Sequence, residues 1–234
     1  CRNEITFTPN YHLADLPIVD VLTDALDIPV WLENEANLSA LAEKTFVENH
    51  KNLIHVSIHT GVGAGIILDH HLYTGFAGTA GEAGHMIVQP GGRSCPCGNH
   101  GCLEQYISEP AVLSRYQELS GRTTVSIDDL VWSYNQKEAD ALAVVDEFTT
   151  YLACGINNLW NLFSPECIIL NSQLTAYLPQ LLPEILQKLS ARFRATCQLK
   201  LSTLQDTGVL LGATRVCISK YLGIEKLYFS GFQP

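Results

Sequence analysis

The chain has 234 residues, of which 47% are hydrophobic and only 16% are charged, and its formal net charge is −10. This composition is typical of one large folded domain or two small ones, and it excludes disorder as the main state. The excess of acidic residues repels a phosphate backbone, so nucleic-acid binding would need a basic surface or a separate module, and the sequence contains neither. No apolar stretch approaches the roughly 18 residues that span a bilayer, and no secretory signal opens the chain, so we expect no membrane insertion.

The first quarter of the chain predicts a helix, a strand and a second helix. Apolar residues recur at helical spacing over residues 16–26, and Pro29 closes that segment. Residues 29–32 are a short apolar run and predict a buried strand. Residues 33–37 form the polar sequence Glu-Asn-Glu-Ala-Asn, after which helical periodicity returns over residues 38–46. We therefore expect the polar residues to lie where a strand passes into a helix.

The next segments predict two strands around a glycine-rich turn. Residues 53–58 alternate as a strand, residues 60–65 read Thr-Gly-Val-Gly-Ala-Gly and break it, and residues 66–72 resume with a hairpin turn at 69–71. Residues 75–103 hold eight of the 17 glycines, so we expect this stretch to be irregular and organised by something other than an apolar face.

The remainder of the chain is predominantly helical. Helical patterns cover residues 104–119, 139–162, 178–195 and 208–221, and one β-rich run lies at 166–170. No internal repeat or linker separates the segments, so we predict one α/β assembly with a mixed sheet. The leucine-rich stripe from Leu178 to Leu189 is explained either by core packing or by a self-association surface.

A group of potential metal ligands lies in the irregular stretch. His85, Cys95, Cys97 and Cys102 supply one imidazole and three thiolates, the ligand set of a closed tetrahedral zinc site. Thiolates are soft ligands that select zinc over magnesium or calcium. The alternative is a loop with free or disulfide-bonded cysteines. We predict a structural zinc that holds the loop of residues 85–102.

Two carboxylates lie close in sequence to these ligands. Glu82 precedes His85 by three residues, and Glu104 follows Cys102 by two. A metal with four protein ligands has no open coordination position, so it cannot generate a nucleophile. Its predicted role is to hold the loop, which would fix both carboxylates as acceptors for the hydroxyl groups of a ligand.

These residues resemble the signature of the ROK family, whose name stands for repressors, open reading frames and sugar kinases. The resemblance is carried by Gly81-Glu-Ala-Gly-His85 and by Cys95-Pro-Cys-Gly-Asn-His-Gly-Cys-Leu-Glu104. It extends to the positions of the family's sugar and phosphate motifs and of its closing helix, at residues 7–10, 33–37, 60–65 and 208–213.

The resemblance implies an α/β, actin-like and hexokinase-like fold of two lobes with sugar bound between them. It implies that residues 1–60 are the remainder of the first lobe and that residues 61–234 form the second lobe, with the zinc loop and the C-terminal helices. It also implies a fragment, because the chain starts at Cys1, partway into the family's first lobe.

The resemblance assigns a ligand site residue by residue. Asn34, Glu35, Glu82, His85 and Glu104 are expected to hold the hydroxyls of a sugar, with His85 serving both zinc and sugar. The glycine-rich loop at residues 60–65 supplies a weaker candidate for phosphate binding, at Thr60, Gly61 and Gly63. A glycine-rich turn is also ordinary hairpin chemistry, and both interpretations stay open.

The family contains sugar kinases and sugar-responsive transcription factors, so the resemblance does not decide the activity. Family kinases usually have Asp where this chain has Glu35, and a carboxylate displaced by about 1 Å can cost roughly 100-fold in rate. Residues 168–173 read Ile-Ile-Leu-Asn-Ser-Gln, where family kinases have consecutive glycines that admit the nucleotide. These departures look more like the xylose, glucose and N-acetylglucosamine repressor branch.

We therefore expect the sugar-sensing part of a cytoplasmic regulator that binds a monosaccharide and forms a homodimer. DNA binding would belong to an N-terminal helix-turn-helix module absent from this chain. The alternative is a sugar kinase with ATP and Mg²⁺ as cofactors and Glu35 as general base. A third possibility is an unrelated zinc-stapled binding domain.

Overall fold

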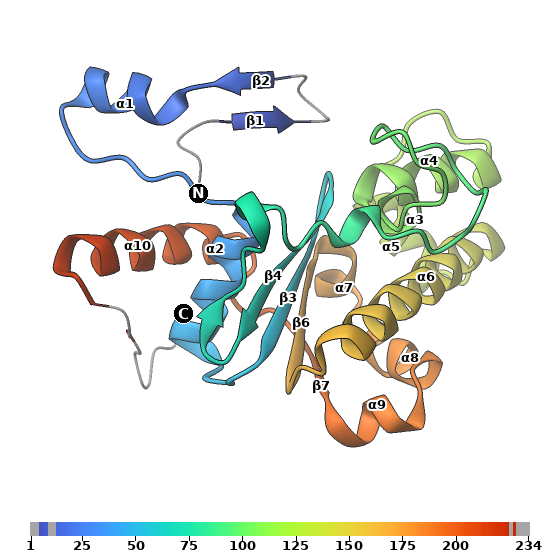
Figure 1. Cartoon of the computed structure of the whole chain (residues 1–234). Helices are drawn as coiled ribbons and strands as arrows, with labels where there is room; N and C mark the ends of the chain where they lie inside the picture. Colours follow the sequence, from blue (N-terminus) through green and yellow to red (C-terminus); the bar gives the residue numbers. More distant parts are fainter. Residues whose placement is uncertain (1–4, 9–12, 225–226, 228–234) are drawn as a thin grey trace.

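The structure is a computed structural model that describes residues 5–8, 13–224 and 227. It is built on a five-stranded mixed sheet in the order β5-β4-β3-β6-β7, with a separate two-stranded hairpin of β1 and β2 near the N-terminus (Figure 1). The strands are β1 Ile5–Thr8, β2 Leu13–Leu16, β3 Leu53–Ile58, β4 Val62–Leu68, β5 His71–Leu72, β6 Cys167–Ser172 and β7 Gln198–Leu201.

The helices differ widely in length, from single turns to the 25-residue α6. Their bounds are α1 Ile18–Leu26, α2 Glu35–Ala42, α3 Glu104–Ile107, α4 Glu109–Ser120, α5 Ile127–Asn135, α6 Ala139–Phe163, α7 Gln173–Tyr177, α8 Leu181–Lys188, α9 Ala191–Thr196 and α10 Thr207–Leu222. A π-helical turn, η1 Glu43–Val47, follows α2, and two short 3-10 turns are η2 Phe76–Gly78 and η3 Ala83–His85. In the part of the chain that the structure describes, no helix is long and apolar enough to cross a membrane.

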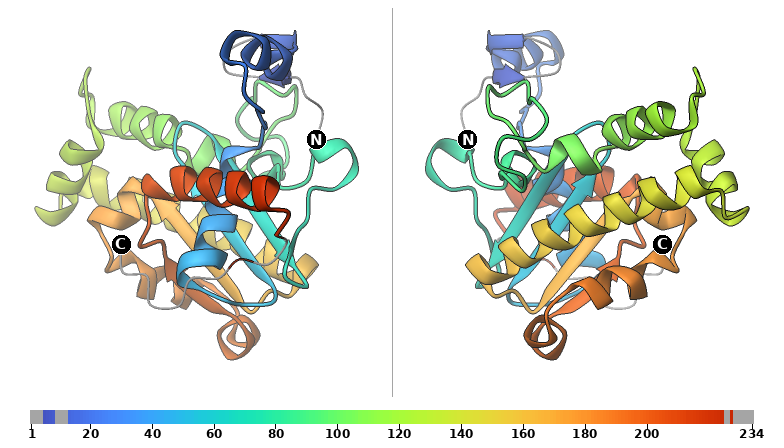
Figure 2. Two further views of the ribbon diagram at one scale, coloured as in Figure 1. Left: turned by 90° about the vertical axis from the view of Figure 1, so that its left-hand side faces the viewer. Right: turned by 90° about the vertical axis from the view of Figure 1, so that its right-hand side faces the viewer.

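The sheet is covered on both faces, with α2 and α10 on one side and α6 on the other (Figure 2). Strand β3 contributes apolar side chains to both faces, because successive side chains of a strand point to opposite sides of the sheet. Leu53 packs with Ala40 and Leu41 of α2, whereas Ile54 belongs to the larger core on the α6 side. Strand β3 is the centre of the sheet, antiparallel to β4 and parallel to β6.

Helix α2 lies unusually close to the sheet. A Cβ atom on Gly65 of β4 would lie 2.2 Å from the carbonyl oxygen of Ala36, so only glycine fits at this position. The contact fixes the first turn of α2 against β4. It therefore places the polar run that precedes and opens the helix beside the β3–β4 turn.

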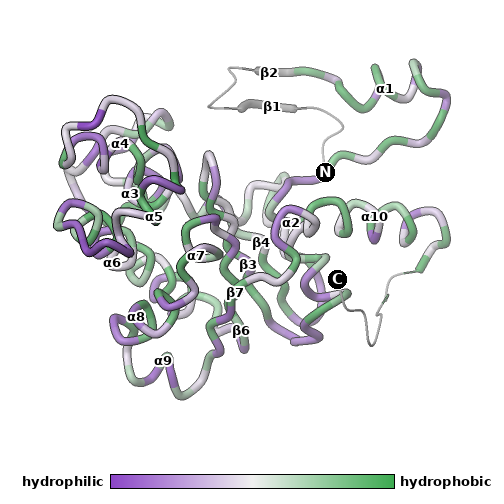
Figure 3. The backbone as a smooth tube through the Cα atoms, turned by 180° about the vertical axis from the view of Figure 1, so that it is seen from behind, coloured by the Kyte–Doolittle hydropathy of each residue, from purple (hydrophilic) through white to green (hydrophobic). Residues whose placement is uncertain are grey.

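Most predicted elements are confirmed. The helices at 16–26, 139–162 and 208–221, the strands at 53–58 and 166–170, and the irregular stretch at 75–103 are present to within a few residues. In Figure 3, α4 and α8 change colour repeatedly along their length, as expected for helices with one face on the core.

The leucine stripe is core. Leu178, Leu181, Ile185 and Leu189 are buried in the cluster on the α6 side, so they are not a surface for self-association. The aromatic C-terminal segment, Tyr228 to Phe232, lies outside the described residues.

Two predictions differ from the structure. Residues 29–32 form no strand, because no neighbouring strand among the described residues pairs with them, and Trp31 is exposed. The chain after Ile58 turns over residues 59–61 only, so Gly63 and Gly65 lie inside β4 rather than in a loop. The predicted lobe boundary at residue 60 lies in the turn between β3 and β4, two hydrogen-bonded strands, and the division of the chain into two lobes stays a prediction.

Candidate functional site

The four predicted metal ligands come together in the structure. All ligand atoms of His85, Cys95, Cys97 and Cys102 lie within 4.8 Å of one another. Nδ1 of His85 lies 3.6 Å from Sγ of Cys95, and Sγ of Cys97 lies 3.7 Å from Sγ of Cys102. A tetrahedral zinc with Zn–S bonds of about 2.3 Å requires sulfur atoms about 3.8 Å apart. The donor set and its spacing therefore fit such a metal.

The cysteines are free thiols, which removes the disulfide alternative for this loop. A disulfide would need sulfur atoms about 2.05 Å apart. Burial raises the pKa of Cys102 to about 12, so this thiol ionises readily only when a cation compensates the charge. The side-chain amide of Gln105 donates to Sγ of Cys95 at 3.7 Å and supports the cluster from outside.

A polar pocket of about 340 Å³ opens between the start of α2, the β3–β4 turn, and Glu82 and Glu104, the two residues that flank the predicted metal-binding loop of residues 85–102. It brings together four of the five predicted sugar contacts, Asn34, Glu35, Glu82 and Glu104, from three separate segments of the chain. The other residues that line it are Ala36, Ser57, His59, Thr60, Gly61, Val62 and Gly63. We call this the acidic pocket, because it has three carboxylates and no Lys or Arg among its described lining residues.

The start of α2 positions the first two of these side chains. Asn34 is the N-cap of the helix, and its Oδ1 accepts hydrogen bonds from the backbone N–H groups of Ala36 and Asn37 at 2.9 and 3.4 Å. The oxygen is therefore committed to the helix, and the amide NH₂ is the part suited to a ligand. Glu35 follows in the first turn, and the Ser57 hydroxyl donates to its Oε1 at 2.9 Å.

The other two carboxylates flank the metal-binding loop. Oε2 of Glu104 accepts a hydrogen bond from the backbone N–H of Val62 at 2.9 Å, which ties α3 to the β3–β4 turn. Glu82 is exposed and directly follows Gly81, whose carbonyl accepts from the backbone N–H of Ala64 at 2.8 Å. Gly81 has φ +89°, and a Cβ there would lie 2.0 Å from the carbonyl oxygen of Ala64, so only glycine permits this approach to β4.

His85 is placed differently from the other predicted contacts. Its Nδ1 faces Cys95, and the residue does not line the acidic pocket. The structure thus brings His85 to the metal ligands, and its role toward a sugar stays a prediction.

Two residues of the acidic pocket were missed by the sequence analysis. Ser57 lies on the α2 side of β3, and His59 directly follows that strand, with Nδ1 3.6 Å from Oε1 of Glu109. The sequence does show Ser57 as a polar residue near the end of a buried strand, which could have indicated a site. Its hydrogen bond to Glu35 could not be predicted, because it joins two segments that are distant in the chain.

Thr60, Gly61 and Gly63 line the acidic pocket, as the phosphate hypothesis requires. The backbone N–H of Val62 beside them is occupied by the Glu104 carboxylate, which also places a negative charge at this turn. Phosphate binding here stays a prediction that the local charge disfavours.

A second polar pocket of about 250 Å³ shares His59 with the acidic pocket. It is lined by Asn171 and Ser172 at the end of strand β6 and by Gln173 at the start of α7, where family kinases were expected to have glycines, and by Glu109 and Asp206. No Lys or Arg occurs among the described residues that line it. This surface is unsuited to a polyphosphate in the absence of compensating cations.

The fold and the metal-binding loop define a class, a mixed α/β sheet of the actin-like and hexokinase-like type with a Cys₃His cluster beside a polar pocket. The chain belongs to the ROK family, whose model matches residues 2–220. The actin-like and hexokinase-like fold predicted from the sequence is confirmed by solved ROK structures.

Both transcriptional repressors and sugar kinases of this family are similar to the chain. A xylose repressor of Bacillus spizizenii is 35% identical over 232 residues, covering 97% of this chain and 60% of the repressor. A glucokinase of Halalkalibacterium halodurans is 32% identical over 224 residues, covering 87% of this chain and 68% of the kinase. A solved ROK transcriptional regulator, described as a homologue of the E. coli MLC protein, superposes with a TM-score of 0.79 at 29% identity and covers 95% of this chain and 60% of the other.

Proposed function

We propose that this chain is the sugar-binding body of a ROK transcriptional regulator that takes a monosaccharide in the acidic pocket. The observation that carries the proposal is the convergence of Asn34, Glu35, Glu82 and Glu104 on one pocket beside the metal-binding loop. The similarity to xylose repressors supports a regulator, although the chain spans about 60% of their length.

The lining suits a neutral polyol. Carboxylates accept hydrogen bonds from hydroxyl groups, and such charge-assisted bonds are stronger than neutral ones. The Asn34 amide supplies a donor for a ring or hydroxyl oxygen. Three carboxylates without a neighbouring Lys or Arg would repel a phosphorylated sugar, so the free sugar is the expected ligand.

The predicted zinc would be held by His85, Cys95, Cys97 and Cys102, and it would supply structural rigidity. Because its four ligands leave no open position, it would take no part in chemistry. Its effect on the pocket would be indirect, through Glu82 and Glu104, which lie on either side of the loop.

The kinase alternative is supported by the glucokinase relative and by the presence of Glu35 in the acidic pocket. Against it stands the neighbouring pocket, where Glu109 and Asp206 occupy the surface expected to face nucleotide phosphates. We propose that sugar is bound and not phosphorylated.

In the regulator hypothesis, the sugar changes how a homodimer presents DNA-binding modules that lie outside this chain. The ligand can shift that equilibrium only by its differential affinity for the two states. Light scattering of the purified chain with and without sugar tests the dimer directly.

Calorimetric titration with xylose, glucose and N-acetylglucosamine tests the sugar site. We expect saturable binding of one of these sugars, and its loss in Glu35→Ala and Glu82→Ala. Binding that is unchanged in both variants would refute the assignment of the acidic pocket.

A coupled phosphorylation assay with ATP, Mg²⁺ and the bound sugar separates the two activities. We expect no turnover by the chain. Turnover that disappears in Glu35→Gln would make the protein a kinase and would contradict the regulator proposal.

A further inference from the structure

A further pocket lies away from the acidic pocket, at the other end of α2. It has a volume of about 640 Å³ and is formed by the end of α2, the η1 turn, strand β5 and helix α10. Its charged lining residues are Lys44, Arg215, Lys220 and a single carboxylate, Glu33, together with His70 and His71. We call this the basic pocket.

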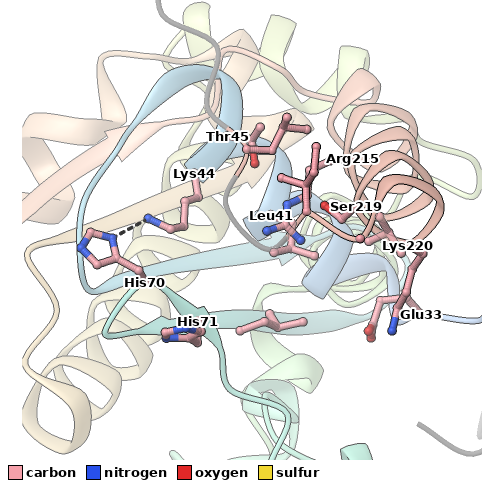
Figure 4. A pocket seen from close by; sticks show the side chains of 14 residues that line it. Glu33, Leu41, Lys44, Thr45, His70, His71, Arg215, Ser219 and Lys220 are labelled. Atoms are coloured by element: carbon pink, nitrogen blue, oxygen red, sulfur yellow. Dashed lines mark hydrogen bonds between the residues drawn. The ribbon is translucent and has the colours of Figure 1, made fainter.

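Cations surround this pocket from several elements. Figure 4 shows Lys44 and His70 at one end and Arg215, Ser219 and Lys220 of α10 at the other. A local excess of positive charge is unexpected in a chain of net charge −10. Such a concave basic surface attracts anions and raises their local concentration.

The geometry brings two of these cations near each other in a low-dielectric environment. Lys44 is 5% exposed, and its Nζ contacts the His50 carbonyl at 3.0 Å and Nδ1 of His70 at 3.1 Å. Burial, and then the positive charge of Arg215, hold the pKa of Lys44 below its usual value, while Glu166 acts in the opposite direction. An anion between the two cations would relieve their repulsion.

One polar group on α10 lacks a partner. Oγ of Ser219 is buried and has no hydrogen-bond partner among the described residues. A buried hydroxyl without a partner costs free energy, and a ligand oxygen in the pocket would satisfy it.

The pocket is too large for an inorganic ion alone, and its lining is half apolar. Leu41, Leu72, Val216, Ile224 and Leu227 contribute the apolar surface. A ligand that fits has a charged head for the cations and an organic body for the leucines and isoleucine.

From these observations we infer that the basic pocket binds a small organic phosphate, such as a phosphorylated metabolite. The phosphate lies between Arg215, Lys220 and the Lys44 end of the pocket, and the organic body covers the apolar wall. This ligand is distinct from the neutral sugar proposed for the acidic pocket, and the inference does not depend on that proposal.

The test is calorimetric titration of the whole chain with glycerol 3-phosphate, glucose 6-phosphate and inorganic phosphate, with glycerol as the uncharged control. We use the Glu82→Ala background, so that sugar binding in the acidic pocket does not contribute. We expect a phosphate ester to bind, glycerol not to bind, and inorganic phosphate to bind at least tenfold more weakly than the best ester.

Variants locate the site. Arg215→Gln and Lys220→Gln should each weaken ester binding about tenfold or more, because each removes a charged hydrogen-bond donor. Lys220 is exposed, so its variant tests the site even if Arg215→Gln fails to fold. Lys137→Gln, an exposed lysine outside the pocket, is the matched control and should leave binding unchanged.

Three outcomes would overturn the inference. They are no binding of any phosphate at millimolar concentration, equal weakening by Lys137→Gln and Lys220→Gln, and inorganic phosphate binding as tightly as both esters. The last outcome would leave a simple ion site without recognition of an organic body. Titration of the unmutated chain with free sugar distinguishes any of these failures from a failure of the acidic pocket.

Discussion

The acidic and basic pockets are built on the same segment of the chain and have opposite charge. Residues Asn34 and Glu35 at the start of α2 line the first, and Leu41, Lys44 and Thr45 at its end line the second. Each charge suits its end of the helix, because the N-terminus carries partial positive charge and the C-terminus partial negative charge. The helix dipole therefore favours the charge present at either end.

The comparison shows that the ligand class of each pocket follows from its charge. Carboxylates without cations suit hydroxyl groups, and cations with a single carboxylate suit an anion. The two pockets also differ in which segments hold their lining residues in place. The acidic pocket includes Glu82 and Glu104, which flank the predicted metal-binding loop, whereas no residue from 82 to 104 lines the basic pocket.

Removal of the metal should have the largest effect and should separate the two pockets. Chelation, or Cys97→Ser, should lower the melting temperature by on the order of 10 °C and abolish sugar binding, because the loop loses its organising centre. Phosphate binding should persist while the chain stays folded. Calorimetry and metal analysis measure these effects, and Cys217→Ser, at an exposed free cysteine, is the control.

Substitution of Glu82 by Gln should weaken sugar binding by 10- to 100-fold, since it removes one charge-assisted acceptor. Binding of glycerol 3-phosphate should not change. Asp128→Asn, at an exposed position on α5, controls for a general effect of net charge. A parallel loss of both ligands in Glu82→Gln would contradict the independence of the pockets.

Glu43, on the η1 turn, should make stability pH-dependent. Burial raises the pKa of Glu43 to about 7, although a hydrogen bond from Ser202 opposes the shift. The folded state therefore binds the proton of the Glu43 carboxyl group more tightly than the unfolded state does. As the pH rises from about 4.5 through 7, the free energy of unfolding should fall by at most about 3 kcal/mol.

His55 has the opposite dependence. Burial lowers the pKa of His55 to about 3, so its contribution to stability is lost as pH falls below about 6.5.

The difference in unfolding free energy between the wild type and Glu43→Gln, measured against pH, separates the effect of Glu43 from that of His55. We expect Glu43→Gln to gain stability relative to wild type between pH 5 and pH 8 in denaturant titrations, and a constant difference would refute the assigned pKa.

The smallest expected effect is that of Ser57→Ala, which removes the hydroxyl that orients Glu35. A hydrogen bond to a charged group contributes about 1.5 to 3 kcal/mol, and the hydroxyl acts on the sugar only by orienting Glu35, so sugar affinity should fall by no more than about 10-fold. Ser219→Ala is its counterpart in the basic pocket and should affect only the phosphate. Titration of each variant with both ligands tests this symmetry.

Much of the fold was predictable because long periodic segments, such as α6, carry their own signal. The metal ligands were predictable because their residue types and spacing define the chemistry. By contrast, α5 and β7 were missed, because a short helix and a short edge strand have little periodicity, although Ser126 and Asp129 form a capping box at the start of α5.

The basic pocket could not have been predicted from the sequence. Lys44 and Arg215 are far apart in the chain, and only the packing of α10 against α2 brings them to one cavity. Ser57 was missed for the same reason, since its importance lies in a contact with Glu35 on another element.

The π-helical turn after α2 has a consequence for the length of the chain. The backbone N–H of Glu48 donates to the carbonyl of Glu43 at 2.7 Å, so this turn holds one residue more than an α-helical turn. Deleting one residue here would restore ordinary helix and leave the N-cap at Asn34 intact. Only the side chains inside the turn, among them Lys44, would change direction, because the wider turn holds the extra residue locally. An ancestor or relative shorter by one residue at this turn could thus keep the acidic pocket and lose the lysine of the basic one.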